Sequence, residues 1–215
     1  MRNEALNYKF LALGFRYPDE SLLLALREAP WSKDSLKEVS LEDLQREHTR
    51  IFSLSVAGGV PPYETEYGRR EIFRKSQELA DIAGFYRAFG LEVSEGAHER
   101  IDYIGAELEL MHWLALKEDY AEEKGWKEKA ELCRKAAKDF LQEHLGRWAP
   151  FFGDEIVKVS NLEFYRFLGR ELDRFLSSEC KRRGAKPDKI HQYVPVVPEG
   201  ENSCDSCPSS SGTEL

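Results

Sequence analysis

The sequence predicts an all-α fold, a single-domain bundle of about seven to ten helices. Through most of the chain, apolar residues recur at steps of three and four, as on one face of a helix. No stretch shows the sustained alternation with turn pairs that strands would need. No unit recurs at a fixed period, which excludes a repeat array. At 215 residues, the chain is long enough to bury a core of its own.

Four helices are expected in the first quarter of the chain. The first covers about residues 3–15, and a short second one covers residues 22–27. A weaker helix lies between residues 31 and 39. Ser40 precedes two acidic residues and is a good N-cap for a helix over residues 41–54.

Four longer helices are expected further on, over residues 69–89, 101–116, 126–145 and 162–181. Gly90 suits the position after the end of the first of these. The helix over residues 101–116 is the most apolar one and is therefore expected to be central.

Two segments lack a helical pattern. Residues 148–159 are rich in aromatic side chains and are interrupted by Pro150, and we assign no helix to them. Residues 184–215 contain Pro, Ser, Gly and acidic residues without periodicity. The expected organisation is a helical domain over residues 1–183 and an irregular tail over residues 184–215.

The charge balance favours some partners over others. The net charge is −8 and the isoelectric point about 5.3. Such acidity argues against nucleic acid or an anionic membrane as the main partner. No run approaches the roughly 20 apolar residues that span a bilayer, so stable membrane insertion is not expected. The start of the chain does not resemble a signal peptide, so we expect a cytoplasmic protein.

A long break between helices is the most informative segment. Two glycines give the backbone freedom, and two consecutive prolines then hold it extended. Interleaved tyrosines and glutamates follow directly. They could be packing aromatics with surface charges, but the combination favours a lip that binds an apolar, basic ligand. The residues are Gly58, Gly59, Pro61, Pro62, Tyr63, Glu64, Glu66 and Tyr67.

Three acidic residues interrupt the apolar helix over residues 101–116: Asp102, Glu107 and Glu109. A carboxylate buried without a partner is costly or changes its pKa. Either basic residues of the protein pair with these acids, which we weigh as slightly the better reading, or the acids face a cleft. Asp102 could also open the helix from its first turn.

Nothing in the sequence indicates catalysis or a bound cofactor. There is no phosphate-binding loop, dinucleotide fingerprint, nucleophile elbow or zinc-protease motif. The five histidines are scattered, and we interpret each as structural or solvent-facing. Cys204 and Cys207 form a C-x-x-C motif with too few further ligands for a closed zinc site. They leave one alternative open, a metal or iron–sulfur carrier.

Four blocks together resemble the TorD/DmsD/NarJ family of redox-enzyme maturation chaperones. The stretch from Pro61 reads PPYETEYG, similar to the family's P-P-Y-E-S-x-Y loop. Residues 85–91 read FYRAFGL and residues 102–111 read DYIGAELELM, similar to two further family motifs. The fourth block covers residues 140–165 and contains F-L-x-x-H-L, W-x-P and F-Y elements. Four motifs in the correct order are specific.

The resemblance implies an all-helical, non-enzymatic, cytoplasmic chaperone. Family members bind the leader of a molybdopterin-dependent oxidoreductase subunit, often a twin-arginine signal, and hold the apoenzyme until its cofactor is inserted. A homodimer formed by helix exchange is compatible with such a fold. Tyr103 stands where the family commonly has histidine, which removes a titratable cation. Carried over by position, the candidate peptide-binding residues are Tyr63, Glu64, Tyr67, Asp102, Tyr103, Glu107 and Glu109.

Overall fold

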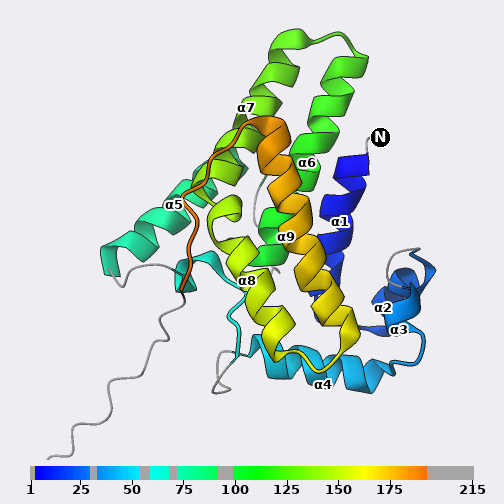
Figure 1. The fold of residues 1–215 in the computed structure, drawn as a ribbon. Helices are drawn as coiled ribbons and strands as arrows, with labels where there is room; N and C mark the ends of the chain where they lie inside the picture. Colours follow the sequence, from blue (N-terminus) through cyan, green and yellow to red (C-terminus); the bar gives the residue numbers. More distant parts are fainter. Residues whose placement is uncertain (1–2, 30–32, 54–58, 68–71, 92–98, 193–215) are drawn as a thin grey trace, which may run out of the picture.

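The computed structural model describes residues 3–29, 33–53, 59–67, 72–91 and 99–192. Over these ranges the regular elements are all helices, with one short 3-10 turn among them, so the predicted all-α class is confirmed (Figure 1). The first helices are α1 (Asn3–Phe15), α2 (Glu20–Glu28), α3 (Lys33–Leu36) and α4 (Leu41–Phe52). They are followed by η1 (Glu64–Glu66), α5 (Ile72–Ala88), α6 (Ile104–Glu123), α7 (Lys127–Glu143), α8 (Leu145–Val159) and α9 (Glu163–Arg183).

Side chains and a glycine set several helix ends, and the predicted Ser40 cap is confirmed. The Asp19 carboxylate accepts from the Leu22 amide at 2.8 Å and caps α2. The Ser40 hydroxyl accepts from the Asp43 amide at 3.0 Å and caps α4. Gly184 follows α9 with a φ of 68°, a left-handed conformation that costs glycine little.

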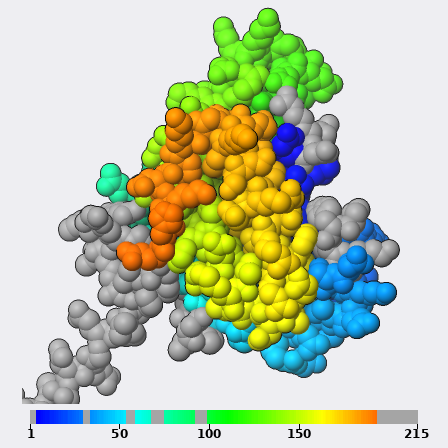
Figure 2. Space-filling view, in the orientation of Figure 1, coloured from blue at the N-terminus to red at the C-terminus, as the bar shows by residue number. Residues whose placement is uncertain are grey.

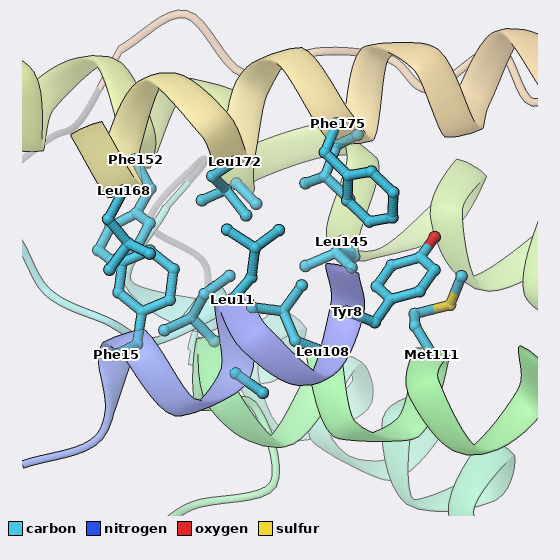
Figure 3. Close-up of a cluster of buried hydrophobic side chains, with 14 of the residues drawn as sticks. Tyr8, Leu11, Phe15, Leu108, Met111, Leu145, Phe152, Leu168, Leu172 and Phe175 are labelled. Carbon is cyan, nitrogen blue, oxygen red and sulfur yellow. The ribbon is translucent and has the colours of Figure 1, made fainter. Parts of the chain in front are cut away.

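The core lies where α1, α6, α8 and α9 meet. α1 packs against α6 and α8 against α9, while α7 packs along α6 and forms with it a hairpin that extends beyond the rest of the bundle (Figure 1). Figure 3 shows side chains from all four core helices interlocking. The largest fully buried residue is Trp148 of α8. α6 is central, as its apolar composition predicts.

Three predictions about helices are wrong: both ends of the central helix, and the absence of a helix around Pro150. The central helix ends at Glu123 and not near residue 116. The central helix was expected from residue 101 but begins at Ile104, because the preceding backbone pairs with the loop at residues 62–64. Residues 145–159 form a helix that includes Pro150. The proline lies in the second turn, where it removes a single backbone hydrogen bond, and the buried aromatic side chains around it compensate for that loss.

The chain after α9 has no regular secondary structure up to residue 192 but lies against the bundle (Figure 2). The Ile190 amide donates to the Arg147 carbonyl at 2.8 Å, and Ala185 is buried. Residues 193–215 of the tail, including Val194, Val196 and Val197, lie outside the described residues. Among the described helices, none is long and apolar enough to cross a membrane.

Candidate functional site

The Pro-Pro loop pairs with the start of α6, as the sequence suggested. The Ile104 amide donates to the Pro62 carbonyl and the Glu64 amide to the Asp102 carbonyl, both at 2.9 Å. Together they make Tyr63 and Tyr103 an antiparallel bridge. The prolines have no amide hydrogen, so the extended loop offers its carbonyls instead. Gly58 and Gly68, at its two ends, lie outside the described residues.

Arg100 joins the two halves of this pairing. Its guanidinium donates to both carboxylate oxygens of Asp102, at 2.9 and 2.7 Å, and to Glu66 at 3.1 Å. It also donates to the Thr65 hydroxyl at 2.6 Å and lies 4.5 Å from the centre of the Tyr63 ring. Burial would raise the pKa of Glu66, but Lys75 and Arg100 outweigh it and lower that pKa. The two hydrogen bonds from Arg100 thus pair Asp102 within the protein.

A second buried network connects the loop with α5, α6 and α8. His144 Nδ1 lies 3.2 Å from both Glu64 oxygens, and Nε2 lies 3.2 Å from Asp81. Burial lowers the pKa of His144, but the carboxylates of Glu64 and Asp81 outweigh it, so that this pKa is raised. The two carboxylates thus favour the protonated form of the imidazole.

Glu107 lies at the buried end of the network. It is fully buried, and the Trp148 indole donates to its Oε2 at 3.1 Å. Burial, and next the negative charge of Glu64, raise the pKa of Glu107 well above its ordinary range. Among the described residues, no hydrogen-bond partner lies within reach of its Oε1.

The two remaining predicted residues on the loop and helix differ in exposure. Tyr67 is buried, its hydroxyl donates to the Pro61 carbonyl at 2.8 Å, and its ring lies 5.1 Å from that of Trp148. The side chain of Glu109 is 50% exposed and pairs with Lys9 at 3.0 Å.

A cavity of about 370 Å³ opens beside the paired loop and helix, between α1, α5 and α6. Its wall mixes apolar surface with charges of both signs. Tyr103 lines the cavity, and its hydroxyl donates to the Phe15 carbonyl at the end of α1. The lining residues are Ala12, Arg16, Tyr86, Glu99, Arg100, Ile101, Tyr103, Gly105, Ala106 and Glu109.

The structure brings all seven predicted residues into one region but gives them different surroundings. Tyr103 and Glu109 line the cavity, and Tyr63 borders it through its contact with Arg100. Glu64, Tyr67, Asp102 and Glu107 are at most 3% exposed and lie behind its walls. Pairing inside the protein accounts for Asp102 and Glu109. The interpretation of Asp102 as the first turn of the helix is wrong, because it precedes α6.

Sequence reasoning missed Arg100 and His144. Arg100 falls in a stretch without helical periodicity, although its position two residues before Asp102 was a usable signal. His144 was interpreted as structural, and its two carboxylate partners come from distant segments. Among the described residues, no group of three or more possible ligands could hold a metal ion. Cys204 and Cys207 lie outside the described residues.

Known proteins resemble this chain over most of its length. Residues 14–154 match the family described as nitrate reductase delta subunit. A selenate reductase assembly chaperone protein from Thauera selenatis is 33% identical over 190 residues, covering 87% of this chain and 94% of that protein. A chlorate reductase assembly chaperone protein from Ideonella dechloratans is 28% identical over 189 residues, covering 87% and 93%.

Solved structures that share the fold include the crystal structure of a protein from Archaeoglobus fulgidus assigned to redox enzyme maturation. The TM-score is 0.54 at 22% sequence identity, over 82% of this chain and 95% of that one. At this identity, the likeness concerns the arrangement of the helices alone.

Proposed function

The chain belongs to the nitrate reductase delta subunit family of redox-enzyme maturation chaperones, and from this we propose that it is a non-enzymatic chaperone acting in the cytoplasm. Its client is the apo-form of a molybdopterin-dependent oxidoreductase subunit. It binds the leader or N-terminal region of that subunit, of the twin-arginine type, while the cofactor is inserted and the enzyme assembled. Relatives named as reductase assembly chaperones, matched over nearly their whole length, support this assignment.

The cavity beside the Pro-Pro loop is the observation that carries the leader-binding proposal. It has apolar walls for the hydrophobic part of a leader, and carboxylates of Glu99 and Glu109 at the wall for basic residues. Tyr63, Tyr103 and Glu109 are the residues that contact the peptide. With Arg100 in place, Glu64, Tyr67, Asp102 and Glu107 lie behind the wall and support the loop against α6.

Apolar burial supplies most of the affinity in this proposal. Transfer of apolar surface from water yields roughly 25 cal/mol for each Å². An exposed ion pair, such as one that a leader arginine would form with half-exposed Glu109, contributes only about 0–1 kcal/mol. Charge therefore contributes selectivity and orientation more than strength.

Filling the cavity tests the proposal without removing a buried contact. Ala106 lines the cavity from α6, and Ala106→Leu adds bulk there while keeping a good helix former. Isothermal titration with a twin-arginine leader peptide should show wild-type binding, and an affinity reduced at least about tenfold in the variant, because a blocked apolar contact costs about 1.4 kcal/mol or more.

Ala25→Leu is the matched control, because Ala25 is exposed on α2 and does not line the cavity. It should bind the peptide as the wild type does. Equal binding by Ala106→Leu would show that the peptide does not enter this cavity. Absence of wild-type binding to every leader tried would contradict the proposed function itself.

A further inference from the structure

Arg100 already occupies the groups that the loop offers to a guanidinium. Two of its nitrogens form a fork on Asp102, a geometry specific to arginine. A third nitrogen reaches Glu66, and the guanidinium carbon lies over the Tyr63 ring. The loop and the start of α6 therefore form a complete guanidinium site, filled by a residue of the same chain.

The Asp102 carboxylate cannot accept a second guanidinium while Arg100 is in place. Its Oδ2 accepts from Arg100, from the Thr65 amide at 3.2 Å and from the Thr65 hydroxyl at 2.8 Å. Its Oδ1 accepts from Arg100. Asp102 is also 0% exposed, and an incoming cation would meet the like charge of Arg100 first.

Arg100 is placed where an incoming group could replace it. Its side chain is 36% exposed and lines the cavity, whereas Asp102 lies directly behind it. Exchange of one guanidinium for another would conserve the fork, the hydroxyl contact and the ring contact. Such an exchange therefore costs little beyond moving Arg100 into water.

We propose that Arg100 is an internal stand-in for an arginine of the client peptide, which displaces it from the site of Asp102, Glu66, Thr65 and Tyr63. This inference rests on the proposed leader binding. The peptide arginine can bind only those molecules in which Arg100 has left the site. The apparent affinity for the peptide is therefore the intrinsic affinity multiplied by the fraction of molecules in which the site is open. It also makes the site selective, because a peptide without arginine has nothing to offer Asp102 in exchange.

The test is a cycle of two proteins and two peptides, measured by isothermal titration. The peptides are a twin-arginine leader and the same leader with citrulline, an uncharged isostere, in place of each arginine. Arg100→Ala should bind the arginine peptide at least about fivefold more tightly than the wild type, because its competitor is gone. Its affinity for the citrulline peptide should not increase. Arg100→Lys keeps a charge beside Asp102 and thus protects the fold. Its affinity for the arginine peptide should lie between those of the wild type and Arg100→Ala.

Arg50→Ala is the matched control. Arg50 forms a comparable fork on Glu47, at 2.8 and 2.7 Å, and does not line the cavity. It should lose thermal stability without any change in peptide affinity. If Arg100→Ala and Arg100→Lys bind the arginine peptide no more tightly than the wild type, Arg100 only fastens the loop and the proposal fails, while leader binding stands. If no variant binds either peptide, both proposals fail.

Discussion

Glu107 shows how the charge of a buried residue depends on its neighbours. Its position in an apolar helix suggested either a paired carboxylate or one facing a cleft. The structure instead surrounds it with Trp148 and the Glu64 carboxylate, and both burial and Glu64 raise its pKa. The raised pKa favours the neutral, hydrogen-bonding form of Glu107 over a charged one. No sequence pattern carries this information, because Glu64 and Trp148 are distant along the chain.

The stability of the Glu107→Gln variant relative to the wild type should therefore increase as the pH rises. Glu107 has its pKa raised above the ordinary value of 4.5, so its contribution to stability is present below pH 4.5 and is lost as the pH rises towards the folded pKa. Glutamine keeps the acceptor for Trp148 and does not ionise. Relative to the variant, the wild type should lose up to about 1.4 kcal/mol for each pH unit in that window. Urea unfolding at pH 5, 6, 7 and 8 measures the difference.

Glu107→Ala is the comparison for this series. It leaves the Trp148 indole without its acceptor and opens a cavity, so it should cost about 2–4 kcal/mol at every pH. A constant difference between Glu107→Gln and the wild type from pH 5 to 8 would mean that Glu107 ionises normally in the folded protein.

Helices α8 and α9 illustrate what periodicity can and cannot predict about an element. The apolar face of α9 was apparent in the sequence, but α8 was not assigned because Pro150 interrupts its pattern. The two helices pack closely through a pair of glycines. A Cβ on Gly153 would lie 2.7 Å from the Gly169 carbonyl oxygen, and one on Gly169 would lie 2.5 Å from the Gly153 carbonyl oxygen. A glycine in a helix gives no sign of such a partner.

Alanine at either glycine should destabilise the protein. Because backbone atoms on the neighbouring helix block the added methyl group, Gly153→Ala and Gly169→Ala should each cost about 1–3 kcal/mol. Gly84 lies within α5, and a Cβ there would have nothing within 4 Å. Gly84→Ala should therefore stabilise the protein by about 0.5–1 kcal/mol. Urea unfolding of the three variants measures both effects, and the same sign at all three positions would contradict the close α8–α9 contact.

For the whole molecule, the sequence predicted the helical bundle and the meeting of the Pro-Pro loop with α6. The spacing of Leu6, Phe10 and Leu13 predicted a helix here, and α1 is one, but Leu6 is 45% exposed. The face of α1 that lies in the core carries Tyr8, Leu11 and Phe15 instead (Figure 3). The sequence did not predict which of the candidate residues line the cavity and which are buried behind its walls. Whether Asp102 faces a ligand or Arg100 depends on a side-chain direction outside any regular element, where periodicity gives no guidance.

The boundary of the helical domain gives the last prediction. We propose that residues 1–183 form the domain, yet the chain just beyond α9 contacts it through the Ile190 amide and buried Ala185. A chain of residues 1–192 keeps these contacts and should match the full-length protein in thermal stability and leader affinity. A chain of residues 1–183 loses the backbone hydrogen bonds donated by Gly184, Ala185 and Ile190 and a small apolar contact. It should be less stable by about 2–4 kcal/mol. Its leader affinity should be unchanged, because none of the cavity-lining residues lies beyond Glu109. Reduced affinity in either truncated chain would show that the C-terminal segment takes part in the binding site.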